Sequence, residues 1–217
     1  MIKKVDILGI QLDNYTVREA IMCVERYLSN NVLNTIESIS LQMLIDSETN
    51  PVLKEVMSSL DLAIIGEKEI IQAAGLESMQ RIRETEENDF YFEFFKRIER
   101  NKKSVFLLGD TQEKIDSLKA ELAEDYPKLI FAGEYAVETC VGDLEAVIND
   151  MNATTPDVII SVLPSPMQEQ FLYEHRDKMN ANIWYGIGGV PVHKKKHGVL
   201  ARLKSIIPVS YTHLTLP

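Results

Sequence analysis

The sequence has few cysteines and no long hydrophobic run. Only Cys23 and Cys140 are present among 217 residues, too few for a four-thiolate metal site, and we expect both to be reduced and structural. No stretch approaches the roughly 20 consecutive apolar residues of a membrane-spanning helix. The first residues turn polar too soon for a signal peptide, so we expect the chain to stay in the cytoplasm.

Basic residues are outnumbered as well. There are 23 Lys and Arg against 33 Asp and Glu, which gives a formal net charge of −10. Because phosphate contacts supply most of the affinity for nucleic acids, we expect no nucleic-acid partner. Residues 193–204 are the exception, with five Lys or Arg, two His and no acid. This segment is either a contact for phosphates or an anionic membrane surface, or simply a solvated face.

Short apolar segments that alternate with helical patterns are the main sign of the fold. Buried strands are predicted over residues 4–10, 35–40, 61–65, 104–108, 129–132, 158–162 and 183–187. Helices are predicted in most of the intervals, whereas 76–88 is polar without a clear period and is interpreted as a loop. Strands that alternate with helices favour a doubly wound α/β fold, with a mostly parallel, Rossmann-like sheet flanked by helices.

Several residues mark where the predicted helices begin and end. Thr16 and Glu19 form a capping-box pattern, and Asn50 precedes a proline at a first helical position. Gly75 is expected to end a short helix. Asn88 and Asp143 are expected to cap two further helices, the first with the apolar face Tyr91, Phe94, Phe95 and Ile98.

The length is that of one domain, which we place at residues 1–208. Residues 209–217, VSYTHLTLP, have no charge and no amphipathic period. They look like adapter sequence carried into the reading frame. We expect this tail to be non-native and the natural C-terminus to be missing.

The most site-like stretch is 157–176, DVIISVLPSPMQEQFLYEHR. A buried strand runs through Pro164 and Pro166 into a helix whose first turn carries Gln168 and Glu169. In an open α/β sheet, ligands bind where strand ends meet helix starts, because free backbone N–H groups point there. Gln168 and Glu169 are therefore candidate ligand-binding residues.

Other strand ends add weaker candidates. They are Ser38 and Ser40, Gly66 and Glu67, Gly109 with Asp110 and Thr111, and Gly188 with Gly189. The Gly109 turn is better explained as a tight strand-to-helix connection. The glycines at 186–189 lack the third glycine of a dinucleotide fingerprint, so a nicotinamide-dependent oxidoreductase is a weak alternative. No triphosphate-binding loop or metal-ligand spacing is present, and we expect neither metal nor cofactor.

Longer segments carry a specific resemblance. The segments NPVLKEVMSSLDLAI, VFLLGDTQEK, YPKLIFAGEY, NATTPDVIISVLPSPMQEQF and YGIGG occur in the order and spacing of the WecG/TagA/CpsF glycosyltransferases, over about residues 2–202. The resemblance implies inverting transfer of an N-acetylmannosaminyl-type sugar from a UDP-sugar to an undecaprenyl-diphosphate-linked acceptor, in the synthesis of cell-surface polysaccharide or teichoic acid. It also implies peripheral contact with the inner face of the membrane through the missing C-terminus, and it leaves a homo-oligomer open.

The resemblance implies several binding residues. The family's Gln-Glu pair is retained as Gln168 and Glu169, although the glycine of that motif is Pro164 here. Its Thr-x-Asn falls on Ser38 and Ser40, and the acid of its Gly-Ser-Asp motif falls on Asp89. Its paired glycines are Gly188 and Gly189. These residues, together with Gly109, are the candidate substrate-binding set.

The catalytic position differs from the family pattern. The family's proposed catalytic base, an aspartate, falls on Gly66, so the adjacent Glu67 is the candidate base. The Ser-Phe-Asp that normally follows the paired glycines is Val-Pro-Val at 190–192, and no Arg-rich appendage is recognisable past Arg202. Two hypotheses therefore stand: a divergent glycosyltransferase, or a catalytically impaired homologue that binds a nucleotide-sugar or a partner enzyme without transfer.

Overall fold

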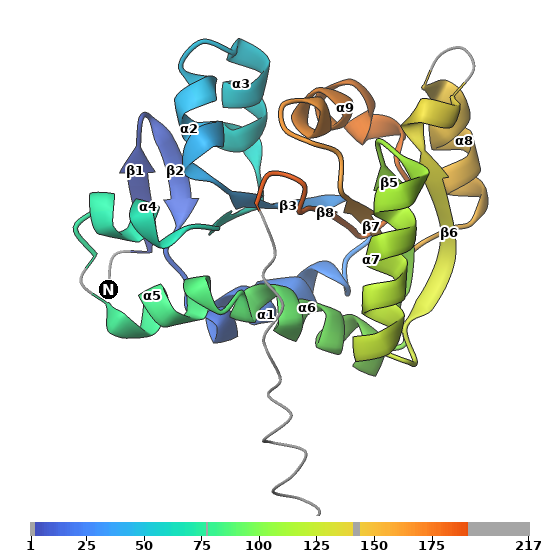
Figure 1. Cartoon of the computed structure of the whole chain (residues 1–217), viewed down its shortest axis with the longest axis horizontal. Coiled ribbons are helices and arrows are strands. Elements are labelled where there is room, and N and C mark those ends of the chain that lie inside the picture. The colour runs from blue at the N-terminus through green and yellow to red at the C-terminus, as the bar shows by residue number, and fades with distance from the viewer. Residues whose placement is uncertain (1–2, 77, 141–143, 191–217) are drawn as a thin grey trace, which may run out of the picture.

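The computed structural model describes residues 3–76, 78–140 and 144–190, and this part of the chain folds around one sheet (Figure 1). The strands are β1 (Lys4–Ile7), β2 (Ile10–Asp13), β3 (Asn34–Ile39), β4 (Leu62–Ile65), β5 (Ser104–Gly109), β6 (Ile130–Ala136), β7 (Val158–Ser161) and β8 (Ile183–Gly186). The helices are α1 (Val17–Tyr27), α2 (Leu41–Ser47), α3 (Pro51–Ser59), α4 (Lys68–Ala73), α5 (Met79–Glu86), α6 (Asp89–Arg100), α7 (Gln112–Asp125), α8 (Glu145–Ala153) and α9 (Met167–His175). Two short 3-10 turns, η1 (Val137–Thr139) and η2 (Arg176–Lys178), complete the set.

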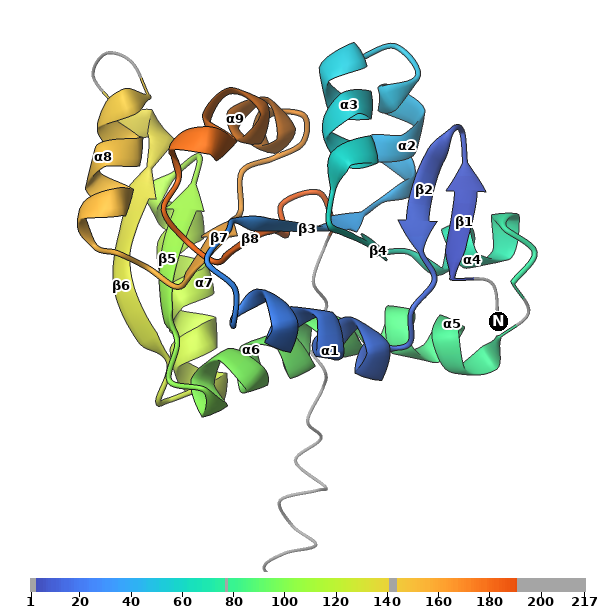
Figure 2. The same ribbon diagram turned by 180° about the vertical axis from the view of Figure 1, so that it is seen from behind.

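The strand order explains where a ligand site can form. Within the described residues the sheet runs β1-β2-β4-β3-β8-β7-β5-β6, and every pairing except the β1–β2 hairpin is parallel. The chain leaves β4 on one side of β3 and returns in β5 beyond β8 and β7, and α5 and α6 run beneath the sheet between them (Figure 2). Open α/β sheets bind ligands outside the carboxyl ends of the strands at such a reversal.

Helices cover both faces of the sheet and create two hydrophobic cores. On one face, α1, α6 and α7 bury side chains such as Phe94 against Tyr185 of β8. On the other face, α2, α3, α8 and α9 bury side chains such as Phe171 against Trp184. Burial on both faces accounts for the nearly continuous apolar strands. The predicted α/β class with a mostly parallel, flanked sheet is confirmed.

Most of the helix boundaries that the sequence marked are also confirmed. Thr16 and Glu19 form both bonds of the capping box at the start of α1, and Asn50 caps α3 by accepting from the Leu53 N–H. Gly75 follows α4 with a positive φ of 65°. The apolar face predicted for α6 is fully buried. The proposed cap Asp143, the basic segment 193–204 and the tail 209–217 lie outside the described residues.

Three predictions of local structure were wrong. The strand expected over 4–10 is a hairpin, in which Leu8 and Gly9 both have positive φ and make a tight turn between β1 and β2. The loop expected over 76–88 contains helix α5, capped by Ser78. Asn88 does not cap α6 with its side chain but joins α5 to α6 in a left-handed conformation.

Among the described residues, no helix is both long enough and apolar enough to span a membrane.

Candidate functional site

A groove follows the carboxyl ends of β4, β3, β8 and β7 on the side of α5 and α6. Its inner part is a cavity of about 40 Å³ bounded by residues that include Ser38, Gly66 and Tyr185. A depression of about 360 Å³ adjoins it beside Glu67 and Lys68, and another of about 320 Å³ adjoins it beside Lys114 and Gly188. Val190 borders all three. We call this the carboxyl-edge groove.

The volumes of the groove limit what each part can hold. A 40 Å³ cavity accommodates only a few water molecules, because one water needs about 10–15 Å³ of such space. The two depressions reach the lower end of the range for small-molecule sites, roughly 300–1,000 Å³. A bound sugar or nucleotide would therefore lie in the depressions, with only a polar atom or a water reaching the inner cavity.

Two hydroxyl groups face each other at the inner cavity. The Ser38 Oγ and the Tyr185 Oη are 3.2 Å apart, on the neighbouring strands β3 and β8. Burial raises the pKa of Tyr185 well above its ordinary value, and the hydrogen bond with Ser38 only partly opposes this. Tyr185 is therefore a neutral phenol at physiological pH, suited to hydrogen bonding rather than to proton abstraction.

The outer depressions carry exposed charges that are already paired. Glu67 accepts a hydrogen bond from the Leu41 N–H, 2.8 Å away, at the start of α2. Lys68 lies 2.5 Å from Glu86, and Lys114 lies 2.6 Å from Asp110. Exposed ion pairs of this kind contribute only about 0–1 kcal/mol, so a phosphate group could compete for either lysine.

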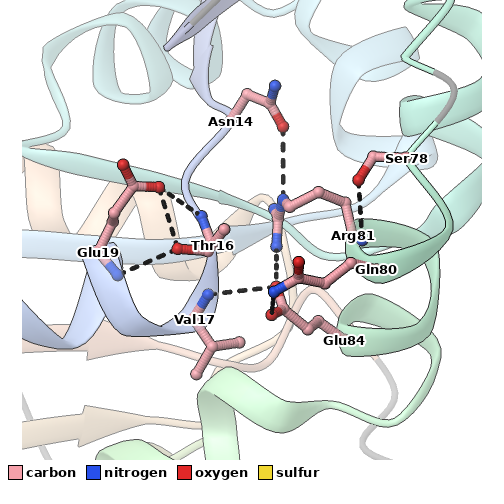
Figure 3. Close-up of polar contacts among 8 residues, drawn as sticks. All are labelled: Asn14, Thr16, Val17, Glu19, Ser78, Gln80, Arg81 and Glu84. Atoms are coloured by element: carbon pink, nitrogen blue, oxygen red, sulfur yellow. Dashed lines mark hydrogen bonds and ion pairs between the residues drawn. The ribbon is translucent and has the colours of Figure 1, made fainter. Parts of the chain in front are cut away.

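Helix α5, which forms one wall of the groove, is held by a buried ion pair (Figure 3). The Arg81 Nη1 is 2.9 Å from the Glu84 Oε2, and the Arg81 Nε donates to the Asn14 Oδ1 at 3.4 Å. The same Glu84 oxygen accepts from the Val17 N–H at the first turn of α1, and its other oxygen accepts from Gln80. One Glu84 oxygen thus joins α5 to α1, while the other forms a hydrogen bond within α5.

The remaining predicted residues lie behind the groove or beside it. Ser40 is buried and caps α2 by accepting from the Met43 N–H. Gly109 packs so closely on Ile115 that a Cβ would come within 2.8 Å of that side chain, as the tight-turn interpretation requires. Asp89 is half-buried in the first turn of α6, next to Asn88, which borders the inner cavity.

The Gln168 and Glu169 side chains are fully buried on the opposite face of the sheet from the groove. Glu37 of β3, also fully buried, is their neighbour. Burial raises the pKa of Glu37 well above its ordinary value, and the nearby Glu169 raises it further. Burial likewise raises the pKa of Glu169, against the hydrogen bonds from its own backbone, Ser165 and Gln168. Burial of both carboxyl groups beside each other thus favours a proton on the pair.

Comparison with known proteins places this architecture in a family. The sequence profile of the glycosyl transferase WecG/TagA/CpsF family matches residues 5–191. The chain belongs to this family. It is similar to N-acetylglucosaminyldiphosphoundecaprenol N-acetyl-beta-D-mannosaminyltransferases of Staphylococcus aureus, from strains NCTC 8325 / PS 47, COL and MRSA252. Each is 22% identical over 188 residues, which cover 86% of this chain and 73% of the relative.

Gly66, where the resemblance to the family expects a catalytic aspartate, has no room for a side chain. A Cβ there would lie 2.6 Å from the Val190 Cγ2 and 2.8 Å from the Ile39 carbonyl oxygen. The Gly66 N–H donates to that same carbonyl at 2.9 Å. Because backbone as well as side-chain atoms fill the space, a side chain at position 66 would require both Val190 and the Ile39 carbonyl to move.

Sequence reasoning missed several residues of the site. Glu37 could have been found, because a charged residue within a strand covered by helices on both faces must be buried. The i, i+3 spacing of Arg81 and Glu84 was also a sign of a helical ion pair. No local pattern indicates the contact of Val190 with Gly66, since it forms only when the segments that follow β4 and β8, two strands separated by β3, come together.

Proposed function

We propose that this chain transfers an N-acetylmannosaminyl-type sugar from a UDP-sugar to an undecaprenyl-diphosphate-linked acceptor, with inversion, in the synthesis of a cell-surface polymer. The observation that carries the proposal is the carboxyl-edge groove, which lies at the strand-order reversal of a sheet belonging to this family. The named activity of the S. aureus relatives supports the choice of sugar and acceptor.

The groove offers groups for both halves of such a reaction. Inverting transfer needs a base beside the acceptor hydroxyl and stabilisation of the departing diphosphate. Glu67 is the proposed base, oriented by the Leu41 N–H. Lys68 and Lys114 are the cations of the described residues that border the two depressions, and either can approach a diphosphate after leaving its present carboxylate partner. Ser38 and Gly188 are proposed substrate contacts.

The proposed transfer can be tested directly. The purified chain is incubated with UDP-N-acetylmannosamine and a lipid-diphosphate-linked N-acetylglucosamine analogue, and the disaccharide product is measured. We expect product to form in proportion to released UDP. Absence of product, together with no UDP release from a panel of UDP-sugars, would contradict the enzymatic function.

Glu67→Gln is expected to reduce the transfer rate about 100-fold, because general-base catalysis typically contributes a factor of 10² or more. The amide can no longer accept the acceptor proton, whereas the Leu41 N–H can still donate to its oxygen. Glu69→Gln is the matched control, since Glu69 borders the same depression from the first turn of α4. Equal rates for the two variants would remove Glu67 from the catalytic role.

A second candidate function is nucleotide-sugar binding, or binding of a partner enzyme, without transfer. It is favoured by the filled space at Gly66, where no carboxylate can be placed without moving Val190 and the Ile39 carbonyl. Under this function we expect calorimetry to detect binding of UDP and the transfer assay to detect no disaccharide product. The same two assays therefore separate the candidates.

Gln168→Ala is expected to weaken binding of the UDP-sugar about tenfold, the effect of one lost well-placed hydrogen bond near the site. Gln168 contacts the Gly188 N–H, and Gly188 borders the groove. Gln170→Ala, at an exposed position of the same helix, is the control. The measurement is the dissociation constant by calorimetry; an unchanged value would mean that the retained Gln-Glu pair has no influence on the ligand.

The lipid-linked acceptor also predicts peripheral contact with the inner face of the membrane. That contact is proposed for the Arg-rich C-terminal segment of the family, which is not recognisable past Arg202. Assembly into a homo-oligomer likewise stays a prediction, to be measured by light scattering of the purified chain.

A further inference from the structure

The side chains of Gln168 and Glu169 do not border the groove, and their hydrogen bonds indicate another role. The Gln168 Oε1 accepts a hydrogen bond from the Gly188 N–H at 3.3 Å. Its amide nitrogen donates to the Glu169 Oε1 at 3.4 Å, and the Ser165 hydroxyl donates to the other Glu169 oxygen at 2.9 Å. A chain of hydrogen bonds thus leads from the β7–α9 turn to the backbone just after β8.

Glycines make this close approach possible. A Cβ at Gly186 would overlap the Gln168 amide, and a Cβ at Gly188 would overlap the Leu163 carbonyl oxygen. The end of β8 therefore lies directly against the first turn of α9 and the turn before it. This packing is a physical reason for the glycine-rich sequence at this strand end, independent of any phosphate.

Glu37 is a neighbour of the Gln168 side chain. Within the described residues, neither oxygen of the Glu37 carboxyl group has a hydrogen-bond partner. Its neighbours are the Glu169 carboxyl, the Trp184 indole and the Gln168 amide. A buried carboxylate pair without a cation is stable only when a proton lies between the two groups. A protonated Glu37 can donate to Glu169, which leaves the Gln168 amide free to turn its oxygen toward Gly188.

We propose that Gln168 is a positioning residue. Its side chain is supported by the Glu37 and Glu169 pair, and its amide oxygen accepts from the Gly188 N–H. This hydrogen bond fixes the backbone of Gly188 and thereby the position of Val190 in the carboxyl-edge groove. Val190 borders every part of the groove, so its position sets the space beside Gly66. Any effect of this contact on substrate binding rests on the proposed function, whereas the hydrogen bond between Gln168 and Gly188 does not depend on it.

The test is amide hydrogen exchange, which needs no substrate. Gln168→Met keeps the side-chain volume but removes the acceptor, and we expect exchange in the peptide 183–190 to accelerate about tenfold while β5 is unchanged. Gln170→Met on the same helix should leave both regions at the wild-type rate. Unchanged exchange in 183–190, or equal acceleration in β5, would overturn the proposal.

A pair of Glu37 variants gives a second route if Gln168→Met does not fold. Glu37→Gln keeps a neutral donor toward Glu169, so exchange in 183–190 should stay within about twofold of the wild-type rate. Glu37→Leu removes that donor, so exchange in 183–190 should accelerate about tenfold. Equal protection in the two variants would refute the supporting role of Glu37.

The link to the groove has its own optical readout. Trp184 is the sole tryptophan of the sequence and is a neighbour of Glu37. We expect UDP to change its fluorescence in the wild type and not in Gln168→Met. If UDP produces no change in the wild type while the exchange result holds, the proposed function fails and the positioning contact stands; a UDP response retained in Gln168→Met would refute the link between Gln168 and the groove.

Discussion

Replacing Arg81 with methionine is expected to lower the free energy of unfolding by about 3–5 kcal/mol, the usual cost of removing one partner from a buried ion pair. Arg81 is 5% exposed and Glu84 is 8% exposed. Once the guanidinium is removed, the Glu84 carboxylate therefore stays buried, and water does not replace its lost partner. Its remaining partners are the Val17 N–H and the Gln80 amide. Urea or guanidinium unfolding at pH 7 measures the loss.

Two further variants identify the cause of that loss. Arg83→Met, at an exposed position of the same helix, should change the free energy of unfolding by less than about 0.5 kcal/mol. The double variant Arg81→Met with Glu84→Leu should recover much of the loss, because apolar residues can replace a buried ion pair at little cost. A loss in Arg81→Met no larger than in Arg83→Met would show that the pair does not hold α5 to α1.

The sequence predicted those parts of the fold that depend on neighbours along the chain. The capping box of Thr16 and Glu19 and the cap at Asn50 are contacts across three residues, so their patterns are visible directly. The apolar face of α6 is periodic because one face of that helix meets the sheet. Alternation of strands and helices then determined the parallel sheet, apart from the hairpin at Leu8 and Gly9.

Features that depend on residues far apart in the sequence were not predictable in the same way. The buried face of α5 carries Arg81 and Glu84 instead of apolar residues. The segment therefore shows no apolar periodicity, and the sequence predicts a loop there. Gln168 and Glu169 were expected to face a ligand, yet β8 and Glu37 enclose them. The sequence pointed to the carboxyl edge of the sheet, but only the packing shows on which face of that edge the groove lies.

Raising the pH from 5 to 8 is expected to destabilise the wild type through the Glu37 and Glu169 pair. Both pKa values are raised in the folded chain, first by burial, and for Glu37 also by the Glu169 charge. Above the unfolded value near 4.5, the folded chain thus retains a proton that the unfolded chain has released. The unfolded state binds fewer protons, so the free energy of unfolding falls as pH rises, by up to about 1.4 kcal/mol per pH unit for one proton.

Glu37→Gln should flatten that fall, because an amide of the same shape stays neutral at every pH in the range. The variant should therefore gain stability relative to the wild type between pH 5 and pH 8, as measured by denaturant unfolding at each pH. Glu55→Gln, at an exposed position of α3, is the control and should follow the wild-type slope. Since Glu169 still titrates in the variant, a residual slope is expected. Parallel pH profiles for Glu37→Gln and the wild type would mean that Glu37 is not the group that holds the proton in the folded chain.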